Sequence, residues 1–102
     1  MKGDRTATFI LLESFTDQGI RNVKGTVSRS ADFRALARKQ GGIIKEVFWT
    51  QGRYDVVAIL EAPNEETAAA IALNLASAGN IRLQTLRAFT PEEMQRILEN
   101  VG

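Results

Sequence analysis

The segment of residues 47–62 constrains the fold more than any other part of this chain. It places two runs of β-branched and aromatic residues on either side of Thr50-Gln51-Gly52-Arg53. This pattern predicts a β-hairpin with a glycine in its turn. The second run, residues 54–60, is apolar at nearly every position. Because alternate side chains of a strand point to opposite faces, both faces of this strand need cover, and we expect it in the middle of a sheet.

Three further runs are expected to be strands. Residues 6–15 are again apolar on both faces, with Ala7, Phe9 and Leu11 on one face and Thr8, Ile10 and Leu12 on the other. We therefore expect this strand to pair with residues 54–60 at the sheet centre. Residues 43–50 and 80–89 carry charges such as Lys45 and Arg82, and this mixed character favours edge positions.

Three segments have the periodicity or the caps of helices. Residues 27–40 combine Thr26 as an N-cap with an apolar stripe of Phe33, Leu36 and Ala37. Residues 65–77 are rich in alanine, and Thr90-Pro91-Glu92-Glu93 is a capping box that predicts a short helix to about residue 98. Between the first strand and the first long helix, residues 16–19 are expected to break the strand and residues 20–25 to form an extended turn or one helical turn.

The resulting order is β-α-β-β-α-β plus one helix, which is the ferredoxin-like α+β arrangement with a four-stranded antiparallel sheet. We expect one domain over residues 1–102. Both long helices would cover the same face, so the other face of the two apolar strands would be bare. The expected remedy is a second copy packed sheet to sheet, as a homodimer or a higher oligomer. The alternative is that the terminal helix folds over the open face.

The composition excludes several kinds of site. The 102 residues have a formal charge of +1 and scattered basic residues, so we expect no nucleic-acid or membrane partner. The absence of Cys and His excludes disulfides, thiolate nucleophiles, Cys/His zinc sites and histidine-based triads. We expect no cofactor, and any proton transfer would use Asp, Glu, Lys, Tyr or Arg. Residues 1–5 and the run after them lack the features of a signal peptide, which predicts a cytoplasmic location.

Residues 49–55, Trp-Thr-Gln-Gly-Arg-Tyr-Asp, resemble the motif of the GYD family of small bacterial and archaeal proteins. Residues 16–24, 61–63 and 79–89 match it as well, so the resemblance spans about residues 9–93; Val27 stands where the family pattern has a proline. The resemblance implies a dimeric α+β barrel but little about activity, because the family is essentially uncharacterised. The turn is also similar to the effector-binding domains of Lrp/AsnC-type regulators, which bind amino acids between subunits. The same barrel serves cofactor-independent monooxygenases and isomerases.

Six residues are candidates for ligand binding: Lys24, Trp49, Gly52, Tyr54, Asp55 and Arg82. Each also has a structural reading. Gly52 is typical of a turn that needs positive φ, and Asp55 commonly accepts from turn amides. Trp49 and Tyr54 are either pocket walls or interface anchors. Lys24 either binds an anion or is solvated. Arg82 and Arg87 are five positions apart, so they should face opposite sides of their strand and at most one should reach an interior cavity.

Our first hypothesis is a homo-oligomeric small-molecule-binding module. It would hold a small anionic or amino-acid-like ligand between sheet and helices or at the subunit boundary. One alternative is a cofactor-independent monooxygenase or isomerase in which Tyr54, Asp55 and Lys24 transfer protons; another is a structural assembly partner. A buried lysine or carboxylate with a shifted pKa would favour the enzyme, and an apolar cavity with an arginine would favour the binding module.

Overall fold

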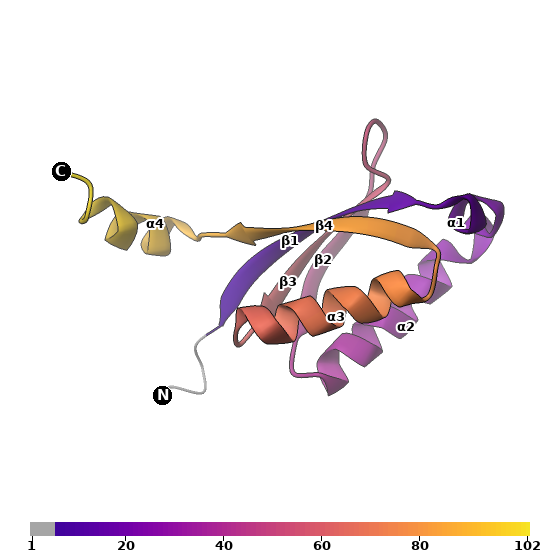
Figure 1. Ribbon diagram of the computed structural model, residues 1–102, viewed down its shortest axis with the longest axis horizontal. Helices are drawn as coiled ribbons and strands as arrows, with labels where there is room; N and C mark the ends of the chain where they lie inside the picture. Colours follow the sequence, from indigo (N-terminus) through magenta and orange to yellow (C-terminus); the bar gives the residue numbers. More distant parts are fainter. Residues whose placement is uncertain (1–5) are drawn as a thin grey trace.

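A computed structural model describes residues 6–102 and contains one antiparallel sheet (Figure 1). The expectation of no signal peptide in residues 1–5 lies outside the described residues. The strands are β1 (Ala7–Phe15), β2 (Ile43–Trp49), β3 (Val56–Ala62) and β4 (Ile81–Ala88), in the spatial order β2-β3-β1-β4. The predicted partition into two central and two edge strands is therefore confirmed.

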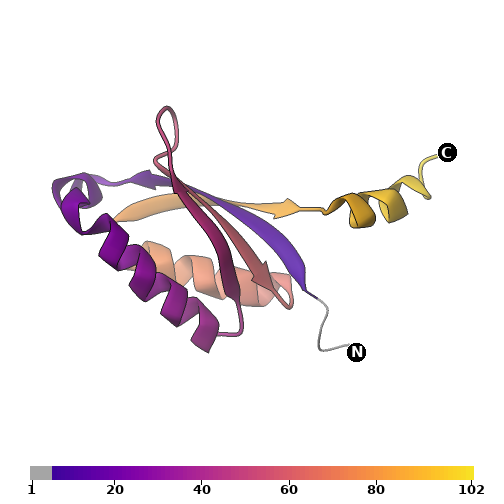
Figure 2. The same ribbon diagram turned by 180° about the vertical axis from the view of Figure 1, so that it is seen from behind.

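The two long helices, α2 (Thr26–Lys39) and α3 (Glu65–Ser77), lie side by side on one face of the sheet, as both views show (Figures 1 and 2). The predicted ferredoxin-like α+β fold is confirmed. Their contacts with the sheet bury a core that includes Leu11 of β1, Leu60 of β3 and Ile71 of α3. Burying such side chains supplies about 1.5–3 kcal/mol each relative to leaving them exposed.

The register of β1 decides which residues face the helices. Phe9, Leu11 and Glu13 alternate as buried residues, so they point toward the helices, whereas Ile10 and Leu12 point to the other face. β2 joins β3 through an irregularity at Lys45, which shifts the register between its two neighbours. Such bulges are common on edge strands, where they discourage further pairing.

No helix of residues 6–102 covers the second face of the sheet, which we call the open face. β1 and β3 present Ile10, Leu12, Val57 and Ile59 there, all half-buried, and Phe48 of β2 is 54% exposed. The terminal helix α4 (Pro91–Leu98) continues past the end of β4 and projects away from the sheet (Figure 2). In this chain, the alternative that α4 folds over the open face is therefore not observed.

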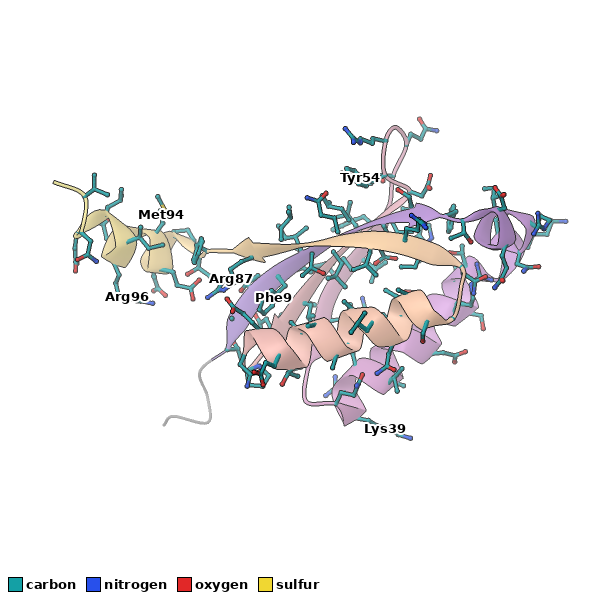
Figure 3. The ribbon with its side chains drawn as sticks, viewed as in Figure 1. Phe9, Lys39, Tyr54, Arg87, Met94 and Arg96 are labelled. Carbon is teal, nitrogen blue, oxygen red and sulfur yellow. The ribbon has the colours of Figure 1, made fainter. Side chains whose placement is uncertain are left out.

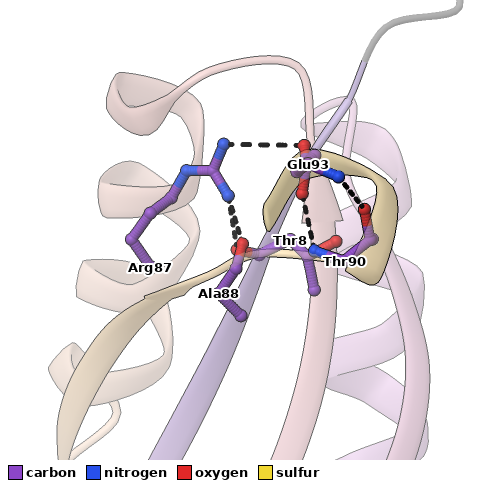
Figure 4. A network of polar contacts seen from close by, with 5 residues as sticks. All are labelled: Thr8, Arg87, Ala88, Thr90 and Glu93. Carbon is purple, nitrogen blue, oxygen red and sulfur yellow. Dashed lines mark hydrogen bonds and ion pairs between the residues drawn. The ribbon is translucent and has the colours of Figure 1, made fainter. Parts of the chain in front are cut away.

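Figure 4 shows how α4 begins. The Thr90 hydroxyl accepts from the Glu93 N–H at 3.1 Å, and the Glu93 carboxylate accepts from the Thr90 N–H at 2.8 Å, which confirms the predicted capping box. The Thr90 N–H holds the pKa of Glu93 below its usual range. Arg87 lies 3.9 Å from the same carboxylate and donates to the carbonyls of Thr8 and Ala88. The start of α4 is thus fixed even though the helix projects.

β1 ends at Phe15, so the expected break of the strand at residues 16–19 is confirmed, and η2 (Val23–Gly25) is the helical turn expected within residues 20–25. The short helix α1 (Asp17–Arg21) was not expected; the Thr16 side chain accepts from the Gly19 N–H and caps it. Two other local expectations were wrong. Thr26 is the first residue of α2 and not its N-cap, so its hydroxyl is available for other contacts. The loop of the hairpin is also longer than expected, since β3 begins at Val56 and not at Tyr54.

Among residues 6–102, no helix has the length and apolar character needed to cross a membrane.

Candidate functional site

A cavity of about 290 Å³ lies between the sheet and α2, with one wall from α3. Its wall is mostly apolar and includes side chains from both helices and from two strands: Phe33, Leu36, Val47, Val56, Ala58 and Leu75. Small residues at positions such as 58 and 78 leave this space unfilled. Its size is at the low end for ligand pockets, which fits a small molecule.

Glu13 is the buried charged residue of this cavity. It lies on β1 between Val56 of β3 and Leu83 of β4, and its exposed fraction is 6%. Burial raises the pKa of Glu13 to about 7, because desolvation penalises the charged form. Near neutral pH this carboxyl can therefore either hold a proton or bind a hydrogen-bond donor as a carboxylate.

Arg29, in the first turns of α2, contributes a positive charge to the cavity wall. Its Nη1 donates to the Asn22 carbonyl at 2.8 Å. Its Nη2 is buried and finds no acceptor within residues 6–102. A buried donor without a partner costs about 1–3 kcal/mol.

Trp49, at the end of β2, lies beside the cavity and is connected to α2. Its indole Nε1 donates to the Thr26 hydroxyl at 3.0 Å. This contact uses the hydroxyl that was expected to cap the helix. Of the six residues proposed from the sequence, Trp49 is the one that lines the cavity.

Tyr54 and Asp55 lie elsewhere and make structural contacts. The Tyr54 hydroxyl and the Gln84 side chain are 3.1 Å apart in a hydrogen bond, on the side of the sheet away from α3 (Figure 3). The Asp55 carboxylate accepts from the Phe15 N–H at 2.8 Å, and the Asp55 N–H donates to the Glu13 carbonyl at 2.8 Å. Asp55 therefore fastens the hairpin loop to the end of β1. Trp49 and Tyr54 do not share a pocket.

The other proposed residues also lie outside the cavity. Gly52 has φ of +108° in the hairpin loop, as a turn glycine needs. Lys24 is exposed in η2. Arg82 is exposed on the open face, opposite Ser14 of β1. Arg87 lies on the helix side of the sheet, so Arg82 and Arg87 face opposite sides of β4 as expected. The guanidinium carbon of Arg87 lies 5.5 Å from the ring centre of Phe9 (Figure 3).

Glu13 and Arg29 were not among the six residues proposed from the sequence. For Glu13 a signal was present, because Glu13 continues the face of Ala7, Phe9 and Leu11 and is thus a charge in an otherwise buried row. For Arg29 the periodicity of α2 gave no such signal. Among the side chains that the structure describes, no group of three or more Asp and Glu residues has the arrangement of a metal site.

Comparison with known proteins identifies the family. The family model of the GYD domain matches residues 9–98. A protein of Thermus thermophilus named glutamine synthetase and cystathionine beta-lyase binding protein is 33% identical over 82 residues, which cover 79% of this chain and 86% of that protein. The match includes the hairpin motif from which the resemblance was first drawn. The chain belongs to the GYD domain family.

Proposed function

We propose that this protein is a small-molecule-binding module and that the cavity between the sheet and α2 is its ligand site. The observation that carries the proposal is an apolar cavity to which Glu13 and Arg29 bring opposite charges. Binding sites for small molecules commonly combine an apolar wall with a few polar groups that orient the ligand. The expected ligand is a small anionic or amino-acid-like molecule.

The module is proposed to act as a homo-oligomer, with the open faces of two copies packed together. Phe48 and Leu86 are 54% and 37% exposed there, next to the half-buried Ile59. Stable interfaces bury about 1,200 Å² or more in total, and an apolar sheet face is a natural contributor. The α4 helix adds exposed Met94 and Leu98, and Met94 lies away from the body of the sheet (Figure 3).

A second candidate function is proton transfer on a substrate in the same cavity. Glu13 supports it, because a buried carboxyl whose pKa is about 7 is suited to a general base near neutral pH. Tyr54, Asp55 and Lys24, which we expected to supply such a role, lie outside the cavity. In this reading Glu13 takes their place, and Glu13→Gln would abolish turnover while a bound substrate is retained.

A third candidate, that of an assembly partner, is supported by the Thermus relative, whose name describes it as a protein that binds glutamine synthetase and cystathionine beta-lyase. For this chain the open face would then contact an enzyme in place of a second copy. A pull-down tests this hypothesis. It compares how much glutamine synthetase, taken from the organism of this chain, is captured by the wild type and by Ile59→Lys. Equal capture by both proteins would exclude the open face as the contact.

Native mass spectrometry tests the main proposal. We expect an oligomer that carries a small-molecule adduct, absent from the denatured mass. Ala58→Leu fills the cavity and should remove the adduct while the oligomer persists. Ala70→Leu, on the exposed side of α3, is the matched control and should retain it. A monomer would contradict the oligomer, and an adduct that survives Ala58→Leu would place the ligand outside this cavity.

A further inference from the structure

Glu13 is a buried carboxyl to which residues 6–102 give no partner. Its exposed fraction is 6%, and its neighbours across the sheet, Val56 of β3 and Leu83 of β4, are apolar. No hydrogen bond or charge from the described residues offsets the desolvation that raises its pKa. A carboxylate in such surroundings is costly unless a donor binds it. A molecule bound in the cavity can supply that donor.

The carboxyl oxygens of Glu13 can be reached from the cavity, which Glu13 lines. Within residues 6–102, the side-chain atoms that are completely covered and lack a hydrogen-bond partner are Nη2 of Arg29 and Oε1 of Gln40. The Glu13 oxygens lack a partner as well but are not among these covered atoms, so they retain accessible surface. A ligand in the cavity can therefore touch the Glu13 carboxyl, whereas it cannot touch Nη2 of Arg29.

The other charged residues of the described cavity wall, Arg29 and Asp32 of α2, do not make a site for an anion. Nη1 of Arg29 donates to the Asn22 carbonyl at 2.8 Å, and Nη2 is completely covered, so this guanidinium cannot hold a ligand carboxylate with two hydrogen bonds. Asp32 adds a second acidic group to the wall. The wall therefore favours a positively charged ligand group over a negatively charged one.

Most of the remaining wall is apolar and includes two aromatic rings. Phe33 of α2 and Trp49 of β2 line the cavity together with aliphatic side chains such as Val47 and Leu75. Aromatic faces attract ammonium groups, and aliphatic side chains favour the hydrocarbon part of a ligand. The cavity volume of about 290 Å³ limits this ligand to a small molecule.

On the basis of the proposed function, we infer that the ligand of this cavity is a small apolar amine, whose ammonium group binds the Glu13 carboxylate and whose hydrocarbon part packs against the apolar wall. An ammonium group gives Glu13 both the missing donor and the opposite charge, and hydrogen bonds between charged groups are about twice as strong as neutral ones. A neutral alcohol supplies a donor without the charge. An acid of similar shape is repelled by the Glu13 carboxylate, so the inference narrows the expected ligand to one without a carboxylate.

Three probes with similar hydrocarbon parts separate these ligand classes. Isoamylamine carries an ammonium group, isoamyl alcohol a hydroxyl in its place, and isovalerate a carboxylate. Trp49 is the one tryptophan of the chain and lines the cavity, so its fluorescence reports binding, and isothermal titration calorimetry measures each affinity independently. At about pH 8 we expect isoamylamine to bind at least about tenfold more tightly than either other probe, because only isoamylamine forms the charged hydrogen bond.

The pH dependence of isoamylamine binding tests the contact with Glu13 in the wild type. Burial raises the pKa of Glu13 to about 7, and an alkyl ammonium group stays protonated to about pH 10. The affinity should therefore rise by up to about tenfold per pH unit from about pH 5 to about pH 7 and then level off. Arg29 keeps its charge over this range, water screens the exposed Asp32, and α3 contributes the neutral Asn74. The affinity for isoamyl alcohol should not rise.

Glu13→Gln removes the charge at nearly constant shape. It should reduce the preference for isoamylamine over isoamyl alcohol to within about twofold and abolish the pH dependence of isoamylamine binding. Glu46→Gln, which removes the same charge on the exposed side of β2, is the matched control and should keep both. Ala58→Leu fills the cavity and should abolish binding of isoamylamine. Circular dichroism establishes that each variant is folded, and if Glu13→Gln is not, the pH dependence of the wild type decides.

The outcomes separate this inference from the proposed function. Equal affinity for isoamylamine and isoamyl alcohol, tighter binding of isovalerate, or an unchanged preference in Glu13→Gln overturns the amine while the cavity remains a small-molecule site. Binding of isoamylamine that survives Ala58→Leu also overturns it. If none of the three probes binds but the native mass carries another adduct, the inference is overturned and the proposed function stands. If nothing binds and no adduct is present, both fall.

Discussion

The indole N–H of Trp49 donates to the hydroxyl of Thr26 at 3.0 Å and so joins the end of β2 to the first turn of α2 beside the cavity. A double-mutant cycle with Trp49→Phe and Thr26→Val measures this contact. The bond is exposed, so we expect a coupling energy of about 0.5–1 kcal/mol in the free energy of urea unfolding. Strictly additive effects of the two substitutions would contradict the contact.

Glu13 should make the stability of the fold depend on pH. Burial raises its pKa from 4.5 to about 7, so between these values the folded state holds a proton that the unfolded state releases. The free energy of unfolding therefore falls as the pH rises from 4.5 to 7, by up to about 3 kcal/mol, and is flat for this group outside that window. The charged groups nearest to the cavity on α2 are Arg29 and Asp32, whereas α3 contributes the neutral Asn74.

The measurement is urea unfolding at several pH values for the wild type and Glu13→Gln. Glutamine does not titrate, so Glu13→Gln should lack the fall in the free energy of unfolding that the wild type shows between pH 4.5 and 7. Glu46→Gln, at an exposed position on β2, is the control and should keep the pH dependence of the wild-type free energy of unfolding. Parallel pH profiles for the wild type and Glu13→Gln would show that Glu13 does not titrate in this range.

The architecture was predictable because it follows from which faces are apolar. Residues 6–15 and 54–60 have apolar side chains on both faces, whereas Lys45 and Arg82 mark the edges, and this alone orders the sheet. Element ends were less predictable: Thr26 has the chemistry of an N-cap, but Gly25 takes that place. The single turn of η2 ends directly before α2 and moves the start of α2 by one residue. The periodicity of the apolar residues does not locate a helix end to within one residue.

The candidate site was predictable only in part, because it depends on distances between elements. The hairpin motif drew attention to Tyr54 and Asp55, but β3 begins after them, so their side chains bond to β4 and to the end of β1. Glu13 could have been identified from the alternation of β1, because it is a charged residue in an otherwise apolar, buried row. The place of Arg29 on the cavity wall depends on how α2 packs against β2, which the chain's local pattern does not encode.

Asp55 should contribute to stability through the end of β1. Its carboxylate accepts from the Phe15 N–H at 2.8 Å in a partly buried position. We expect Asp55→Ala to lower the free energy of unfolding by about 1–3 kcal/mol, because the Phe15 donor is left without its partner. Asp55→Asn keeps an acceptor and should lose less than half as much. Asp17→Ala, an exposed acidic residue in the first turn of α1, is the control. An equal, small loss for Asp55→Ala and Asp17→Ala would refute the structural role.

The open face gives the last prediction, which concerns the oligomer. Ile59 of β3 lies half-buried on this face, beside Ile10 of β1, and points away from the core under the helices. Ile59→Lys would place a charge at the centre of a packed pair of sheets, where desolvation without a partner costs several kcal/mol. We expect light scattering after size-exclusion chromatography to give a monomer for Ile59→Lys and an oligomer for the wild type. Its circular dichroism should match the wild type, because the core side chains are untouched.

Ala70→Lys is the control for this prediction, since it adds the same charge on the exposed side of α3 and should leave the oligomer intact. An Ile59→Lys protein that keeps the wild-type mass would move the interface off the open face. The exposed apolar residues of α4, among them Met94, Ile97 and Leu98, would then be the next surface to test. If instead Ala70→Lys alone dissociates the oligomer, the helices and not the sheet form the contact, and the open face needs another partner.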